Sequence, residues 1–212
     1  MKNPKKTHST KKLYAADFKE LLQITYLTNL KVSALELKKH DITTDREYSV
    51  NPKANQKLEE LYGALIDQNF VSPMHVKWIN KTVGYGVFTE VDLKRGDMVC
   101  EYTGVLCQDI ADDENGYIWD YPTHRFETIP GKKRRKKIRY CIDALQEGNF
   151  ARFINHTIRK YQNVGVVIVP RNNLWHIVYV AKKSIKKGQQ LLTYYGTDYW
   201  RDRQIVPTPI QP

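Results

Sequence analysis

Cysteine is scarce in this chain of 212 residues, which contains only Cys100, Cys107 and Cys141. None of them forms a Cys-x-x-Cys pair, which argues against a disulfide framework and an all-cysteine zinc site and favours a reducing compartment. No run approaches 18 apolar residues, so the sequence predicts no membrane-spanning helix. The basic N-terminus is not followed by an apolar segment, so no secretory signal is expected.

Apolar and aromatic residues, by contrast, are plentiful. Hydrophobic residues make up 41% of the chain, which has 14 Tyr, 6 Phe and 4 Trp. This is enough material for a buried core, so the chain is not a wholly disordered basic tail. Its length predicts one domain with room for a small extension.

The positive charge is unevenly distributed. The net charge is +11, but residues 76–131 carry −5 and residues 132–212 carry +13. A uniformly basic coat is typical of a nonspecific polyanion binder, whereas this division indicates two different contacts, one with a cationic peptide and one with phosphate. Two solvated loops of opposite sign are the alternative. The acidic cluster consists of Asp109, Asp112, Asp113, Glu114 and Asp120.

Helical periodicity is confined to the first 75 residues. Residues 13–39 place apolar side chains at the spacing of one helix face, and residues 51–69 do so behind a potential Asn51 cap and Pro52. Ser72-Pro73 then predicts a boundary near residue 75. These helices either pack on the domain that follows or form a docking module. The expected buried face of the second helix consists of Ala54, Leu58, Leu61 and Leu65.

From residue 76 onward the pattern becomes short and strand-like, with frequent turn-forming residues. Strands without alternating long helices indicate a compact, mostly antiparallel β fold. The expected strands are Val76–Ile79, Tyr85–Thr89, Met98–Tyr102, Val164–Val169 and Trp175–Val180.

Four short segments are candidates for chemistry. GYGVF begins at Gly84, EYTG at Glu101, RFINHT at Arg152 and GQQLLTYYGTDYW at Gly188. Taken singly, each has a plain structural interpretation: a β-turn, a core tyrosine, a hydrogen-bonded core histidine and a closing strand. No further Cys or His follows His156 at ligand spacing, so no metal site is expected, and no G-x-S-x-G elbow supports a serine triad.

Taken together and in this order, the four segments resemble the SET-domain protein-lysine methyltransferases. The resemblance covers residues 76–200. It implies a β-clip fold of short antiparallel strands with a C-terminal pseudoknot, so the chain is expected to be mostly β with an α-helical extension. The implied organisation is an extension over 1–75, a SET domain over 76–200 with an insert at about 105–141, and a tail over 201–212.

The same resemblance implies S-adenosylmethionine as cofactor, with no metal. Backbone groups of the G-x-G segment would approach the cofactor, and the Asn-His segment would hold it by hydrogen bonds. The implied cofactor-binding residues are Gly84, Tyr85, Gly86, Arg152, Phe153, Asn155, His156, Tyr195 and Trp200. The implied catalytic residues are Tyr195 and Tyr102, and the implied lining of the lysine channel consists of Tyr102, Tyr194 and Tyr195.

Methyl transfer to lysine requires a neutral amine, although the free side chain has a pKa of about 10.4. An apolar aromatic channel disfavours the ammonium form. A sulfonium about 5 Å away adds repulsion of about 3 kcal/mol at an effective dielectric of about 20, which lowers that pKa by about 2. Tyr195 would then orient the amine.

The chain departs from the family at several positions. No Cys follows Cys141, so the Cys-rich zinc loop that completes the pockets of many members is absent from this sequence. Trp200 is our candidate to stack on the adenine or close the channel, with core packing as the alternative. Thr157 stands where serine is usual, and Gln189-Gln190 stand where acidic residues are usual.

The expected substrate is a basic, lysine-containing protein segment such as a histone tail, received by the acidic half of the insert. The expected location is the nucleus or chromatin, including that of a host cell if the chain is a microbial effector, with the cytoplasm as alternative. A non-histone basic protein and a catalytically inactive chromatin- or nucleic-acid-binding module stay open as alternatives. The target lysine, the degree of methylation and the oligomeric state stay open too. A nucleosomal DNA contact is expected at Lys132, Lys133, Arg134, Arg135, Lys136 and Lys137.

Overall fold

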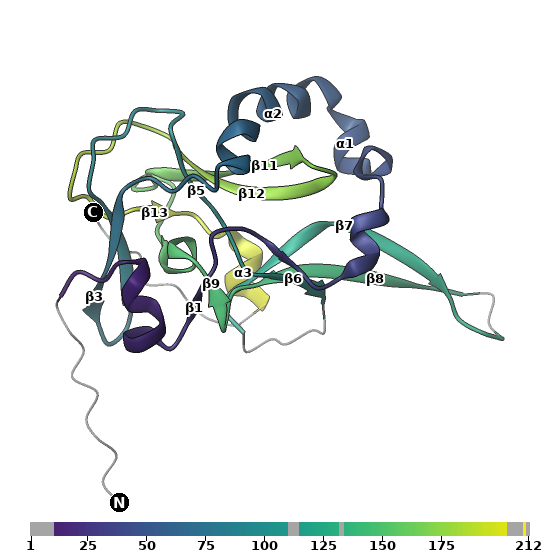
Figure 1. The fold of residues 1–212 in the computed structure, drawn as a ribbon, viewed down its shortest axis with the longest axis horizontal. Coiled ribbons are helices and arrows are strands. Elements are labelled where there is room, and N and C mark those ends of the chain that lie inside the picture. Colours follow the sequence, from purple (N-terminus) through teal and green to yellow (C-terminus); the bar gives the residue numbers. More distant parts are fainter. Residues whose placement is uncertain (1–10, 110–114, 132–133, 203–209, 211–212) are drawn as a thin grey trace, which may run out of the picture.

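The computed structural model describes residues 11–109, 115–131, 134–202 and residue 210. Short strands dominate it and form several small sheets (Figure 1). The strands are β1 Thr25–Tyr26, β2 Lys31–Val32, β3 Met74–Asn80, β4 Gly84–Thr89, β5 Met98–Glu101, β6 Val105–Gln108, β7 Ile118–Thr128, β8 Arg135–Asp143, β9 Glu147–Gly148, β10 Asn155–His156, β11 Val164–Arg171, β12 Leu174–Ala181 and β13 Leu192–Thr193. The helices are α1 Arg46–Val50, α2 Pro52–Asp67 and α3 Thr197–Asp202, with short turns of 3-10 or π type at η1 Ala15–Asp17, η2 Phe18–Leu22, η3 Leu35–Lys39, η4 Ile42–Thr44 and η5 Phe150–Phe153.

Antiparallel pairing holds most of the molecule together. One sheet has the order β11-β12-β5, a second has the order β2-β6-β8-β7, and β3 pairs with β4. The pairs β1-β9, β2-β6 and β10-β13 are parallel. The five strands expected from the sequence are present as β3, β4, β5, β11 and β12, because β-branched and aromatic residues there fit a pleated, buried surface.

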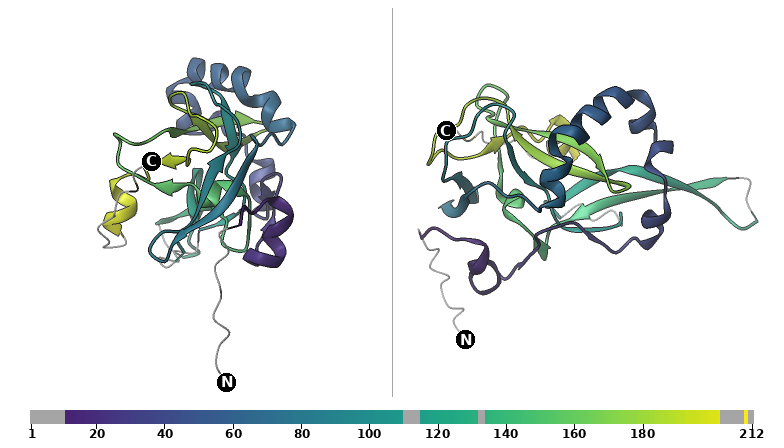
Figure 2. Two further views of the ribbon diagram at one scale, coloured as in Figure 1. Left: turned by 90° about the vertical axis from the view of Figure 1, so that its left-hand side faces the viewer. Right: turned by 45° about the horizontal axis from the view of Figure 1, so that its top comes forward.

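Helix α2 begins where the sequence predicts it. The Asn51 side chain accepts a hydrogen bond from the Ala54 backbone N–H at 3.4 Å, and Pro52 occupies the first turn. The buried face differs from the predicted one, because Leu61 is 55% exposed while Tyr62 and Ile66 are buried. These two side chains pack on β5, β11 and β12, and α2 lies across this sheet (Figures 1 and 2).

The prediction of one helix over residues 13–39 is wrong. Gln23 adopts a left-handed conformation with φ of 59° and ends the short turn η2. The chain then extends, and its strands β1 and β2 pair with β9 and β6. Backbone hydrogen bonds to distant strands therefore replace the helical ones that the apolar spacing suggested.

The first 75 residues share the core of the rest of the chain. Leu13, Phe18 and Leu37 belong to the same buried cluster as Val76 and Trp175. Backbone hydrogen bonds also join Leu13 and Val76 in both directions at 2.8 Å. In the described part of the chain, the N-terminal segment is therefore packed on the sheets that follow it.

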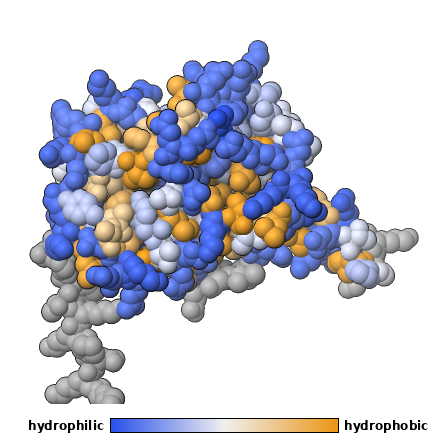
Figure 3. Space-filling model, viewed as in Figure 1, coloured by the Kyte–Doolittle hydropathy of each residue, from blue (hydrophilic) through white to orange (hydrophobic). Residues whose placement is uncertain are grey.

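The surface over α2 is largely hydrophilic (Figure 3). Across the described ranges, no helix has both the length and the apolar character needed to cross a membrane.

Candidate functional site

The parallel pair β10-β13 joins two of the segments singled out in the sequence. Asn155 lies opposite Leu192 and His156 opposite Thr193, and the Thr157 backbone N–H extends the ladder by donating to the Thr193 carbonyl at 2.8 Å. This pairing holds the Asn-His segment beside the Tyr194-Tyr195 step, although His156 and Tyr195 are 39 residues apart in the sequence.

Tyr195 is fixed at both its backbone and its hydroxyl. Its backbone N–H donates to His156 Nδ1 at 3.2 Å, and its hydroxyl donates to the Ile154 carbonyl at 2.7 Å. Gly196 follows with φ of 95°, a conformation that glycine adopts without strain, and starts the turn into α3. The Ile154 carbonyl therefore orients the Tyr195 side chain, while His156 holds its backbone.

An aromatic cluster surrounds His156, which is 7% exposed. The Trp200 indole N–H donates to His156 Nδ1 at 3.3 Å, and the two rings are 4.8 Å apart. Trp200 also lies parallel to Tyr195, with an interplanar angle of 8° and centroids 6.0 Å apart. The sequence analysis predicted Trp200 at this site, and in the structure its ring stacks on that of Tyr195.

The position of these donors assigns the protonation state of His156. Its Nδ1 accepts two N–H groups, so this nitrogen is unprotonated. Burial lowers the pKa of the ring below its ordinary value of 6.5. His156 is therefore a neutral hydrogen-bond partner at neutral pH.

A stability test follows from this lowered pKa. The unfolded chain takes up the His156 proton at a higher pH than the folded chain does, so the contribution to stability is present above about pH 6.5 and is lost as the pH falls below it. We expect the melting temperature to fall more steeply between pH 7 and pH 5 in the wild type than in His156→Gln, measured by calorimetry. His75, whose pKa is also lowered by burial, is present in both proteins. Equal slopes would contradict a neutral His156.

Four tyrosines converge beside this cluster. Tyr102 is buried and donates its hydroxyl to the Tyr117 carbonyl at 2.7 Å, and its ring lies 6.1 Å from that of Trp119. Burial is the main cause that raises the pKa of Tyr102, Tyr179 and Tyr195, and charge on neighbouring tyrosines would add to it. Tyr102, Tyr179 and Tyr195 therefore stay protonated and contribute neutral aromatic rings to this region.

The G-x-G segment lies against the Asn-His segment. The Asn155 side-chain amide donates to the Tyr85 carbonyl at 2.8 Å. Gly86 has no room for a side chain, because a Cβ there would lie 2.5 Å from Ile79 Cδ1 and 2.6 Å from Gln190 Nε2. Gly84 has φ of 78° at the start of β4. The absence of a side chain at Gly86 thus lets this backbone lie close to Asn155.

Arg152 and Phe153 are buried next to the Asn-His segment. The Arg152 guanidinium donates to the carbonyls of Ala144 and Leu145, and it lies 3.8 Å from the centre of the Tyr117 ring. Phe153 packs edge-on against Phe18 and Tyr85. These contacts make both residues supports of the Asn-His segment.

Tyr194 has a different set of contacts from the remaining tyrosines. Its described ring contacts are with His156 at 5.5 Å and with the Arg159 guanidinium at 4.4 Å. The structure therefore does not group Tyr194 with Tyr102 and Tyr195. Tyr117, Trp119 and Tyr179 take that place, although the sequence reasoning missed them. Their only local signal was the aromatic content of β7, of β12 and of the turn before β7 in which Tyr117 lies.

A family model for the SET domain matches residues 84–196. The chain belongs to the SET-domain family. The predictions of this family and of its mostly β fold are thereby confirmed. Residues 84–196 include the G-x-G segment, the Asn-His segment and Tyr195, which the structure brings together.

Several histone-lysine methyltransferases are similar to this SET domain. The histone-lysine N-methyltransferase EZH2 of Chaetomium thermophilum is 30% identical over 128 residues, which is 55% of this chain and 8% of that protein. The N-lysine methyltransferase KMT5A-A of Xenopus laevis is 34% identical over 120 residues, which is 53% of this chain and 33% of that protein. The chain thus spans less than half the length of these relatives.

The fold is also similar to solved structures. The crystal structure of ATXR5 in complex with a histone H3.1 that carries a methyl group superposes with a TM-score of 0.60 at 20% identity, covering 85% of both chains. Within the described ranges of this SET domain, no group of three or more His, Cys, Asp or Glu side chains is arranged to hold a metal ion.

Proposed function

We propose that this SET domain transfers a methyl group from S-adenosylmethionine to the side-chain amine of a lysine in a protein. The observation that carries the proposal is the convergence of Tyr195, Asn155, His156 and the Gly84–Gly86 segment from strands far apart in sequence. Retention of all four in one place is what methyl transfer in this family requires, whereas a scaffold needs none of them.

The residues present fit the cofactor. Gln190 Nε2 is buried and has no hydrogen-bond partner among the described residues, and it adjoins Gly86. Together with the backbone of Gly84–Gly86, the neutral His156 ring and the Trp200 indole, it offers polar and aromatic groups to an amino acid joined to an adenosine. When bound, S-adenosylmethionine supplies an electrophilic methyl group. Asn155, His156 and the two glycines would hold it.

The tyrosines of the site would prepare the lysine. Tyr102, Tyr179 and Tyr195 have raised pKa values and stay neutral, so they offer an ammonium ion no counter-charge. A region lined by these neutral aromatic side chains disfavours the charged amine, so its proton leaves to water. The Tyr195 hydroxyl, held toward Ile154, then orients the neutral amine for in-line attack.

We propose a histone tail as the substrate, which the histone-lysine methyltransferases among the relatives support. Of the acidic cluster expected to receive it, Asp109 is half-buried and Asp120 is exposed. Asp112, Asp113 and Glu114 lie outside the described residues. A basic non-histone protein is the alternative substrate, and a methylation assay with both kinds of protein separates them.

We also propose a nucleosomal DNA contact through the basic run, and hence action on chromatin in the nucleus. Arg134, Arg135, Lys136 and Lys137 are exposed, which supports a contact with phosphate. Lys132 and Lys133 lie outside the described residues.

The DNA contact predicts a difference in salt sensitivity. Raising NaCl from 50 to 200 mM should weaken methylation of whole nucleosomes by at least about tenfold more than methylation of a short histone peptide, because each phosphate contact releases counterions. Initial rates at subsaturating substrate measure this. Equal salt sensitivity of nucleosome and peptide methylation would contradict the DNA contact and leave the basic run with a role in solubility alone.

An inactive SET-like binding module is the proposal's rival from a different class. Calorimetric titration with S-adenosylmethionine distinguishes the two, because a module without methyltransferase activity does not need to bind the cofactor. We expect saturable binding by the wild type and at least about tenfold weaker binding by Asn155→Ala, which frees the G-x-G backbone. No binding at millimolar cofactor would favour the module.

A further inference from the structure

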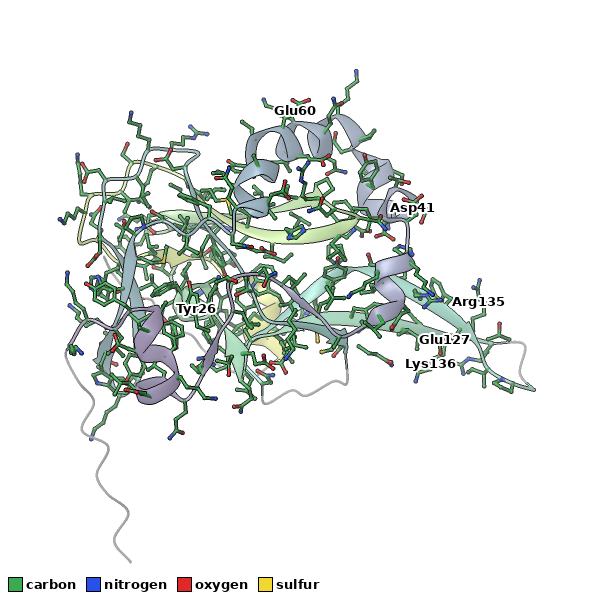
Figure 4. All side chains as sticks on the ribbon, in the orientation of Figure 1. Tyr26, Asp41, Glu60, Glu127, Arg135 and Lys136 are labelled. Atoms are coloured by element: carbon green, nitrogen blue, oxygen red, sulfur yellow. The ribbon has the colours of Figure 1, made fainter. Side chains whose placement is uncertain are left out.

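The ends of β7 and β8 form a ribbon that projects from the body (Figure 1). Strand β6 pairs with β8 only from Tyr140 to Asp143, so residues 124–128 and 135–139 are held mainly by each other. We call these two stretches the ribbon. Part of the basic run lies on it, and Figure 4 labels Arg135, Glu127 and Lys136 there.

The strand register divides the ribbon's charges between its two faces. Cross-strand partners share a face and neighbours along a strand alternate. Thr128 lies opposite Arg135, Phe126 opposite Lys137 and His124 opposite Arg139, and these six side chains form what we call the outer face. The other face holds Arg125, Glu127 and Lys136, followed by the buried Ile138 and Tyr140.

The outer face is cationic along its length. Arg135, Lys137 and Arg139 are exposed and take part in no ion pair among the described residues. On the outer face, the carboxylates nearest in register lie at the base, Asp109 beside Arg139 and Asp120 opposite Cys141, whereas Glu127 lies on the other face. The three cations therefore have no neutralising partner toward the tip.

An exposed aromatic side chain lies between these cations. Phe126 is 49% exposed, and the Arg135 guanidinium lies 5.5 Å from the centre of its ring. Arg135 also donates to the Phe126 carbonyl at 3.2 Å, and the His124 ring packs edge-on against Phe126 at 5.4 Å. These contacts orient Arg135 and leave an apolar surface within a basic face.

We propose that the outer face of the ribbon binds duplex DNA. Alternate residues of a strand are about 6.7 Å apart, which is about twice the 3.4 Å axial spacing of phosphates along one DNA strand. A two-stranded ribbon fits the major groove, which is about 12 Å wide. Phe126 then contacts base edges while the cations meet phosphate. This inference rests on the DNA contact proposed above and makes it more specific. It assigns the contact to Arg135, Lys137 and Arg139 and excludes Lys136, which lies on the other face.

The test measures binding of the full chain to a labelled 25-base-pair duplex by fluorescence anisotropy, in 50 to 200 mM NaCl and without cofactor or histone. The outer-face variant is R135Q/K137Q/R139Q. The control K53Q/K57Q/K136Q removes the same charge from exposed positions of α2 and the other face. We expect the outer-face variant to lose about 3 from the slope of log K against log salt and at least about tenfold in affinity, with the control close to wild type.

Three results would overturn the inference: equal losses in both variants, tighter binding of a single strand than of the duplex, or no DNA binding by the wild type. Circular dichroism checks that both variants fold. Because the assay contains no methyl donor, a chain that binds duplex DNA but methylates nothing would overturn the proposed activity alone. A chain that methylates a peptide but fails this assay would overturn only the ribbon's role.

Discussion

Tyr195→Phe is expected to lower kcat on a histone peptide by about two to three orders of magnitude while changing the Kd of S-adenosylmethionine by less than about threefold. The hydroxyl is held toward the Ile154 carbonyl at 2.7 Å and lies among tyrosines that stay neutral. Removing one pre-oriented polar group from an enclosed site costs about this much in rate. The ring, its stacking on Trp200 and the backbone contact with His156 are kept, so the cofactor side of the site should not change.

Single-turnover kinetics and calorimetric titration measure the two quantities separately. Tyr194→Phe is the matched control, because it also removes one tyrosine hydroxyl, and the described ring contacts of Tyr194 are with His156 and Arg159. It should keep kcat within about threefold of wild type. Equal loss of turnover and cofactor affinity in Tyr195→Phe would give Tyr195 a binding role in place of a catalytic one.

Asp45→Ala is expected to lower the free energy of unfolding by about 3 kcal/mol and the melting temperature by about 6 to 12 °C. The Asp45 carboxylate is 8% exposed and accepts hydrogen bonds from the Trp175 indole at 2.9 Å and the Thr123 hydroxyl at 2.6 Å. His40 Nε2 lies 2.7 Å from its other oxygen. Alanine would leave these buried donors without an acceptor.

Glu47→Ala is the control for removal of a carboxylate, because Glu47 is exposed on α1 two residues from Asp45. It should change stability by less than about 0.5 kcal/mol. Chemical denaturation of both variants measures the difference. If Asp45→Ala unfolds the N-terminal segment alone, in a separate transition that leaves the rest intact, the segment is a docking module and not part of the common core.

The motif-bearing part of the fold could be predicted from sequence because its signals are local. Position 86 has no room for a side chain, and position 196 needs a residue that adopts a positive φ without strain. Both requirements are met by glycine, which can be recognised directly in the sequence. The strands β11 and β12 are mostly apolar, with β12 almost wholly buried and β11 partly so, which their β-branched and aromatic composition indicates.

The rest depends on partners that are distant in sequence. Residues 13–39 have helical spacing, yet β1 and β2 pair with strands more than 70 residues away. The strands β6, β7 and β8 were missed: β6 is only four residues long, and the consecutive charged residues at the start of β8 hide the alternation of a ribbon. Tyr117 contributes through its backbone carbonyl, which accepts a hydrogen bond from the Tyr102 hydroxyl. Every residue has such a carbonyl, so this contact cannot be predicted from the residue type.

Methyl transfer itself is the measurement that tests the central claim most directly. Wild-type protein and Tyr195→Phe would be incubated with labelled S-adenosylmethionine and with nucleosomes, free histones and a basic non-histone protein, and modified lysines mapped by mass spectrometry. The account predicts label on defined histone lysines with wild type and at most about a hundredth of it with Tyr195→Phe. Absence of label on every substrate, despite saturable cofactor binding, or label that persists undiminished in Tyr195→Phe, would contradict it.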